Sequence, residues 1–183
     1  MSKVIGIGNA LVDVLIQLPD ERILEQFNLP KGSMQLVDQD FVKKLTEATA
    51  SFPQTLCSGG SAANMIHGLA TLGIETGFVG SICKDSWGEV FVNDLQKKSV
   101  EPKLFYTDME TGRAYTLITP DGERTFATFL GAATLLDGTD IKKDLLGGYE
   151  YFHIEGYLVF NHHLMIKTGQ TADKLGLTVS LDL

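Results

Sequence analysis

The sequence predicts an α/β fold, in which a mostly parallel β-sheet has helices on both faces and a small group of extra strands covers one end. Short apolar runs alternate with segments whose apolar residues recur at helical spacing. This alternation is typical of β-α-β units, whose strands pair in parallel. Two segments of antiparallel character, residues 10–37 and 113–130, interrupt it. Because both follow sheet strands, at the end where open α/β sheets bind ligands, we expect them to form a lid over a site.

Composition limits the classes of function. The chain has 183 residues, of which 44% are hydrophobic and 21% charged, enough apolar material for one globular domain. A formal charge of −8 disfavours a nucleic-acid partner, because such binding depends on Lys and Arg that neutralise phosphates. No apolar run approaches the roughly 20 residues of a membrane span. The two cysteines, Cys57 and Cys83, have no metal-like spacing and nothing resembles a secretory leader, so we expect a cytoplasmic protein.

The first strand is predicted over residues 3–8, and its Gly6-Ile-Gly8 ending invites comparison with a dinucleotide-binding fingerprint. The third glycine of that fingerprint is replaced by Leu11, and the residues that follow have the pattern of a strand. Without a helix N-terminus there is no seat for a pyrophosphate. A Rossmann oxidoreductase is therefore disfavoured.

Asp13 is the polar exception in the second predicted strand. The period of two places it on one face with Leu11 and Leu15 and leaves an apolar set on the other, made of Val12, Val14, Ile16 and Leu18. Its carboxylate lies near the Gly8-Asn9 turn, where it can accept hydrogen bonds from the hydroxyls of a small molecule. A solvated strand carboxylate is the competing interpretation.

The stretch from Leu56 to Gly73 is predicted to be a ligand-binding loop that leads into a helix. The pair Gly59-Gly60 lets a ligand approach the backbone, and Ser61 is a candidate N-cap. Asn64 would lie on the first turn beside unpaired amides. The helix would direct an apolar set to the core: Ala62, Ile66, Leu69, Ala70 and Leu72. An ordinary loop-to-helix connection is the alternative.

The remaining elements follow in order. Residues 19–33 are polar and irregular. The strands predicted after them are at 34–37, 76–82, 103–106, 149–155 and 177–181, with hairpin arms at 113–119 and 124–130. The predicted helices are one from Asp38, one capped by Asp85, a short one at 141–146 and one from an Asn161 cap to Leu175. No helix follows to cover the last strand, so we expect the N-terminal part of a longer protein.

Two motifs and the two-piece lid together resemble the ribokinase-like (PfkB) family of carbohydrate and nucleoside kinases over the whole chain. The motifs are Gly8-Asn-Ala-Leu-Val-Asp13 and Gly59-Gly-Ser-Ala-Ala-Asn64, whose forms are most similar to the adenosine kinase branch. The resemblance implies a three-layer ribokinase-like fold with a small β-strand lid. Residues 1–183 would form the N-terminal part of one kinase domain, with lid segments 10–37 and 113–130 and without the C-terminal ATP-binding and catalytic part.

The resemblance also implies the site. Residues matching the hydroxyl-binding positions of the family are Asn9, Asp13, Gly59, Gly60 and Asn64, with Ser61 as a contact in nucleoside kinases. The lid would supply apolar cover from Leu11, Met34, Leu36 and Phe129, and Glu155 matches an acidic position that touches sugar. ATP and Mg²⁺ would be the cofactors, bound mainly by residues beyond this chain, and a homodimer through the lid is a further implied partner.

The catalytic machinery of the family has no match here. Its Asp after a Gly-Ala-Gly turn and its Asn-x-x-Glu motif occur nowhere in the 183 residues, and Ile66 and Cys83 depart from its first signature. We therefore expect the substrate-binding part of an ATP-dependent kinase that phosphorylates a hydroxymethyl group of an adenosine-like nucleoside or a ribose- or fructose-like sugar, with no catalytic residue, no metal ligand and no activity in this chain alone. A non-catalytic nucleoside- or sugar-binding pseudokinase is the alternative. A metal hydrolase using His153, His162 and His163 is disfavoured, because adjacent histidines point to different helix faces.

Overall fold

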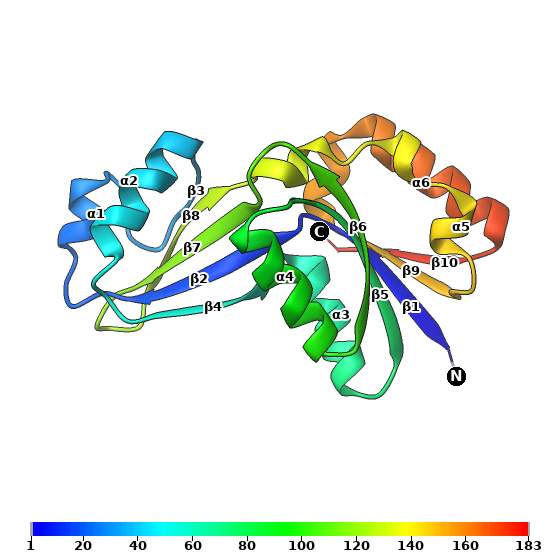
Figure 1. Ribbon diagram of the computed structural model, residues 1–183, viewed down its shortest axis with the longest axis horizontal. Helices are drawn as coiled ribbons and strands as arrows, with labels where there is room; N and C mark the ends of the chain where they lie inside the picture. The colour runs from blue at the N-terminus through cyan, green and yellow to red at the C-terminus, as the bar shows by residue number, and fades with distance from the viewer. Residues whose placement is uncertain (1, 183) are drawn as a thin grey trace.

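A computed structural model describes residues 2–182, and two five-stranded sheets organise it (Figure 1). The main sheet is entirely parallel in the order β10-β9-β1-β5-β6. Its strands are β1 (Lys3–Ile7), β5 (Glu75–Cys83), β6 (Val100–Thr107), β9 (Tyr151–Ile154) and β10 (Thr178–Leu181). All five therefore present their carboxyl ends to the same edge, where ligands of open α/β sheets bind.

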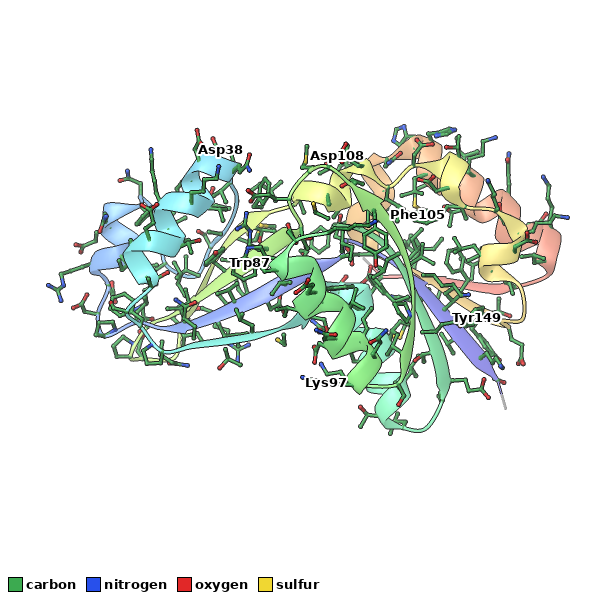
Figure 2. The ribbon with its side chains drawn as sticks, in the orientation of Figure 1. Asp38, Trp87, Lys97, Phe105, Asp108 and Tyr149 are labelled. Atoms are coloured by element: carbon green, nitrogen blue, oxygen red, sulfur yellow. The ribbon has the colours of Figure 1, made fainter. Side chains whose placement is uncertain are left out.

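Helices cover both faces of the main sheet, as the alternation of elements predicted. One face packs against α3 (Ser61–Thr71) and α4 (Ser86–Lys97), and the other against α5 (Lys143–Leu146) and α6 (His162–Leu175) (Figure 1). Three short 3₁₀ turns at 131–135, 138–140 and 156–160 complete the second layer. Neighbouring residues of β5 pack on opposite faces of the main sheet: Phe78 lies in the core on the α4 side, and Val79 lies in the core on the α6 side. Figure 2 shows Phe105 of β6 on this second side of the sheet, toward α5.

The second sheet, called here the lid sheet, has the order β3-β8-β7-β2-β4. Its strands are β2 (Leu11–Gln17), β3 (Met34–Leu36), β4 (Gln54–Gly59), β7 (Gly112–Ile118) and β8 (Arg124–Phe129). One face packs against α1 (Arg22–Gln26) and α2 (Gln39–Thr49), at the left of Figure 1. Val12, Val14 and Ile16 are fully buried on that face, which confirms the face assignment made for β2.

The structure corrects several local expectations. Residues 56–59, predicted to lie in the ligand-binding loop, belong to β4, an edge strand antiparallel to β2. The irregular segment 19–33 contains the short helix α1. Gly60, with φ of 99°, is the N-cap of α3 and Ser61 is its first helical residue, so Ser61 is not the cap. Leu72 is 78% exposed at the end of this helix and does not join the core. Pairing with β2 accounts for β4, and the positive φ of Gly60 accounts for the start of α3 at Ser61.

No helix within residues 2–182 is both long enough and apolar enough to cross a membrane.

Candidate functional site

The candidate site lies where three parallel strands of the main sheet end and the lid sheet begins. Asn9 follows β1, Glu155 follows β9 and Asp182 follows β10. The pairing of β1 with β9 and of β9 with β10 places these three residues side by side. The N-terminus of α3 faces them, because Ala62 and Ser61 form hydrogen bonds to Glu155 and Asp182.

Glu155 is the buried centre of this arrangement. Only 1% of it is exposed, and its Oε1 accepts hydrogen bonds from the backbone N of Asn9 at 3.2 Å and from Asn9 Nδ2 at 2.5 Å. Its Oε2 accepts from the backbone N of Ala62 at 3.2 Å. Burial raises the pKa of Glu155, and these bonds act in the opposite direction. Glu155 therefore fixes both the Asn9 side chain and the start of α3.

Two glycines make this close packing possible. A Cβ on Gly8 would collide with the Glu155 carboxylate, and one on Gly60 would collide with the carbonyl oxygen of Asn9. Gly60 also needs its positive φ, which a residue with a side chain rarely adopts. Glycine at positions 8 and 60 therefore allows the backbone to pack directly against Glu155 and Asn9.

Asp13 is the carboxylate whose acceptors are free for a ligand. Within residues 2–182 no hydrogen bond or ion pair holds it, and its pKa is raised to about 6, chiefly by burial, with the charge of Lys98 opposing. Gly59 lies directly against it, and a Cβ there would overlap the carboxylate. A partly buried carboxylate without partners is suited to accept hydrogen bonds from the hydroxyls of a polyol.

Ser61, Asn64 and Asp182 complete the rim. Ser61 Oγ donates to Asp182 Oδ2 at 3.0 Å, and the backbone N of Gly156 also donates to this carboxylate. Asn64 is exposed on the first turn of α3, with its backbone N bonded to the Gly60 carbonyl at 3.0 Å. Asp182 was missed in the sequence analysis. Its position directly after a predicted strand of the main sheet could have identified it as a site residue.

The lid sheet brings three of the four predicted apolar residues to one face. Asp13 pairs with Ala114, Ala114 with Thr128, and Thr128 with Leu36, so Leu36 lies on the same face as Asp13. Leu11 is two residues from Asp13 and Met34 is two residues from Leu36, so both also lie on this face. Leu11 is 7% exposed, whereas Met34 and Leu36 are 48% and 65% exposed.

Phe129 does not join this face. It pairs with Arg113, which pairs in turn with the fully buried Val12, and its ring centroid lies 5.4 Å from the Arg113 guanidinium. Residues that pair directly point to the same side of a sheet, so Phe129 lies on the face opposite to Asp13. Phe126, the Cα partner of Met34, lies on the Asp13 face instead.

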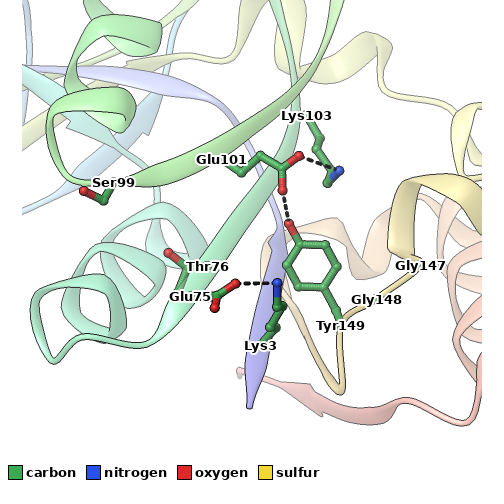
Figure 3. Close-up of a pocket in the computed structure, with 9 residues that line it drawn as sticks. All are labelled: Lys3, Glu75, Thr76, Ser99, Glu101, Lys103, Gly147, Gly148 and Tyr149. Carbon is green, nitrogen blue, oxygen red and sulfur yellow. Dashed lines mark hydrogen bonds and ion pairs between the residues drawn. The ribbon is translucent and has the colours of Figure 1, made fainter. Parts of the chain in front are cut away.

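A separate pocket of about 360 Å³ lies at the other end of the main sheet (Figure 3). Its charged side chains already pair with each other: Lys3 with Glu75, and Lys103 with Glu101 at 3.0 Å. Tyr149 Oη donates to Glu101 at 2.6 Å. Because it lies at the amino ends of the strands and its charges are satisfied, it is a weaker candidate site than the carboxyl edge.

Comparison with known proteins identifies the family of this chain. The family model described as pfkB family carbohydrate kinase matches residues 39–179. The chain belongs to the pfkB carbohydrate kinase family. Among curated relatives, this pfkB chain is 28% identical over 163 residues to guanosine-inosine kinase of Escherichia coli, which covers 85% of the chain and 37% of that protein. It is 33% identical over 99 residues to probable fructokinase-5 of Arabidopsis thaliana, covering 52% of the chain and 31% of that protein.

Solved structures agree on the fold. The adenosine kinase from Sinorhizobium meliloti has 30% identity and a TM-score of 0.85, over 98% of this chain and 56% of that one. A probable sugar kinase from Rhizobium etli has 27% identity and a TM-score of 0.86, over 98% of this chain and 55% of that one. The expected ribokinase-like fold is confirmed. The pfkB chain spans somewhat over half of these two kinases, and 37% or less of the two curated relatives.

Proposed function

We propose that this pfkB chain is the acceptor-binding part of an ATP-dependent kinase, and that the whole protein phosphorylates a hydroxymethyl group of a nucleoside or a sugar. One observation carries the proposal: the unpartnered Asp13 carboxylate lies beside Gly59, at the edge where Glu155 holds Asn9 in place. The similarity to guanosine-inosine kinase and to an adenosine kinase supports a nucleoside acceptor, and the similarity to fructokinases supports a sugar.

Each residue has a separate task in this proposal. Acceptor hydroxyls donate to Asp13, and the amide of Asn64 reaches them from the first turn of α3. Asn9 gives its Nδ2 to Glu155, which leaves its amide oxygen as a fixed acceptor. Gly59 and Gly60 let the sugar ring lie against the backbone. The apolar side chains on the Asp13 face of the lid sheet exclude water that would otherwise compete for the phosphoryl group.

ATP and Mg²⁺ do not fit the residues present. No group of three or more His, Cys, Asp or Glu side chains in residues 2–182 could hold a metal ion. No glycine in the sequence is followed by lysine, so a Walker loop is absent. The first turn of α3 already receives the carboxylate of Glu155 and lies near Asp182, which disfavours a phosphate there. We therefore assign both cofactors mainly to residues outside these 183 and expect no turnover by this chain alone.

A second copy of the protein is a further proposed partner, held through the lid. Its contact would be β3, an outer strand of the lid sheet on which Met34 and Leu36 are largely exposed. Sedimentation of the full-length protein and of a Leu36→Glu variant tests this proposal. A dimer that the substitution dissociates supports it, and a monomeric wild type overturns it.

The test of the kinase proposal is a turnover assay on the full-length protein with ATP and Mg²⁺. Guanosine, inosine, adenosine, ribose and fructose serve as acceptors, both ADP and the phosphomonoester are measured, and calorimetry measures the binding of each acceptor. We expect one nucleoside or sugar to give equal amounts of both products. Binding of an acceptor without product would establish the non-catalytic alternative, and the absence of binding by every acceptor would overturn the proposal.

A further inference from the structure

A partly buried polar cluster lies next to Gly59-Gly60 and joins β4, α3 and α4. Ser58, which is 1% exposed, donates twice to Asp94 Oδ2, from its backbone N at 2.8 Å and from its Oγ at 2.5 Å. His67 Nε2 lies 3.2 Å from Ser58 Oγ. Lys98 Nζ lies 3.0 Å from Asp94 Oδ2 and 3.3 Å from His67 Nδ1. These four residues are called the Ser58 cluster.

The proton positions in the Ser58 cluster follow from its chemistry. The pKa of His67 is lowered to about 4, first by burial and then by the charge of Lys98, so the ring is neutral at pH 7. Lys98 can only donate, so Nδ1 of His67 accepts and Nε2 carries the hydrogen. His67 therefore donates to Ser58 Oγ, and Ser58 Oγ donates to Asp94. The ring of hydrogen bonds closes at Lys98, which donates to both His67 and Asp94.

A hydrolytic role does not suit this cluster. In a Ser-His-Asp triad the histidine accepts the serine proton and the acid orients the histidine. Here the serine hydroxyl donates to the aspartate itself, and only 1% of Ser58 is exposed. The Asp94 carboxylate stays ionised, because hydrogen bonds from Ser58 and Lys98 hold its pKa below the usual value although burial acts to raise it.

The location of the cluster links it to the acceptor site. Ser58 directly precedes Gly59, the residue packed against Asp13, and Asp94 holds Ser58 through both its backbone and its side chain. A shift of Ser58 therefore moves Gly59 and Gly60 relative to Asp13 and Asn9. Lys98 of α4 is the charged group that acts on Asp13, and its charge favours the ionised form of Asp13. Cys57 of β4, the Cα partner of Asp13, is itself acted on by the charges of Asp13, Lys98 and Asp94.

We propose that Asp94 and Lys98 are positioning residues for the acceptor site, and that through Ser58 they fix the Gly59-Gly60 turn against Asp13. This inference rests on the proposed acceptor site at Asp13. It predicts that acceptor affinity falls when the ring of hydrogen bonds is opened, although no member of the ring touches the acceptor. Lys98 has a second effect, because its charge lowers the pH at which Asp13 becomes ionised.

The test uses the full-length protein and the acceptor that it phosphorylates best. Asp94→Ala and Lys98→Met open the ring, because Asp94 Oδ2 alone accepts from Ser58 and Lys98. Glu89→Ala and Lys97→Met are matched controls on the same helix, where both side chains are exposed; Figure 2 shows Lys97 at the far end of α4. We measure KM for the acceptor, KM for ATP, kcat, the melting temperature and the pH dependence of acceptor binding. Ser58→Ala replaces Asp94→Ala if the latter fails to fold.

We expect Asp94→Ala to raise the acceptor KM about tenfold or more, with kcat and the KM for ATP nearly unchanged. Lys98→Met should move the lower pH limit of acceptor binding upward, an effect that lost packing alone would not produce. Unchanged acceptor KM in Asp94→Ala, or an unmoved pH limit in Lys98→Met, would overturn the inference while leaving the kinase proposal intact. A wild-type protein that binds no acceptor would instead refute the proposed function.

Discussion

Gly59 of β4 lies directly against the carboxylate of Asp13 on β2, so closely that a Cβ at position 59 would overlap the carboxylate group. In the β2–β4 pairing Gly59 is opposite Leu11, two positions from Asp13 and on the same face. The absence of a side chain at Gly59 is therefore what leaves room for the Asp13 carboxylate and for a hydroxyl bound to it.

Gly59→Ala should reduce acceptor affinity by about tenfold or more, because the added methyl displaces the Asp13 carboxylate. The matched control is Gly68→Ala on α3, where a Cβ meets nothing within 4 Å and where alanine favours the helix by about 1 kcal/mol. Acceptor titration calorimetry on both variants is the measurement. Equal affinity of Gly59→Ala and wild type would show that the space beside Asp13 is not part of the site.

Asp13→Asn should stabilise the protein at neutral pH while abolishing acceptor binding. Burial raises the pKa of Asp13 to about 6, so the folded state holds its proton more tightly than the unfolded chain, whose value is near 3.8. Stability therefore falls as pH rises from about 4 to about 6, and the full cost is present at pH 7.5. Removing the charge should recover about 1–3 kcal/mol there.

The control for Asp13→Asn is the same comparison of melting temperatures at low pH. At pH 4 the wild-type carboxyl is protonated, so the melting temperatures of wild type and variant should converge. A variant less stable than wild type at pH 7.5 would show that Asp13 has a favourable partner in the folded protein, contrary to the assignment of a free carboxylate.

Glu155→Gln should weaken both stability and acceptor affinity without creating a cavity. The amide oxygen of Gln can serve Asn9 or Ala62 but not both, since the two occupy different oxygens of Glu155. A buried donor without an acceptor costs about 1–3 kcal/mol. Chemical denaturation and acceptor titration measure the two effects, with the exposed Glu150→Gln as control. If affinity survives a measured loss of stability, the orientation of Asn9 does not matter for binding.

Cys57 should be a reporter of acceptor binding. It is the Cα partner of Asp13 on the same face, and its pKa is raised by burial and by the charge of Asp13. Alkylation should therefore be slow at pH 7.5, accelerate at higher pH and slow further with saturating acceptor. Cys83→Ser removes the other thiol of these 183 residues, and mass spectrometry of the labelled peptide that contains Cys57 gives the rate. An acceptor that leaves the rate unchanged would place binding elsewhere.

The sequence predicted most of the fold because its signals were local. The period of two in β2 separated Asp13 from Val12 and Val14, and the caps Asp38, Asp85 and Asn161 marked three helix starts that the structure confirms. Such features depend on neighbours within a few residues, so they are visible without a three-dimensional partner.

The missed features depend on partners far along the chain. Residues 56–59 lie in a strand because β2 pairs with them. Gly60, not Ser61, is the N-cap of α3, and the Ser61 hydroxyl bonds instead to Asp182, 121 residues later. Phe129 was placed on the wrong face because the register of β7 with β8 sets its direction, and a shift of one residue reverses a side chain. The Ser58 cluster joins three elements, so no single stretch of sequence revealed it.

The most direct test of the account is calorimetric titration of the full-length protein, without ATP, with the acceptor that it phosphorylates best, for wild type and Asp13→Asn. The account predicts that the wild type binds with a lower pH limit near 6, set by the pKa of Asp13, and that the variant folds but loses binding by about 100-fold or more. A folded Asp13→Asn protein that binds the acceptor as tightly as the wild type would contradict it.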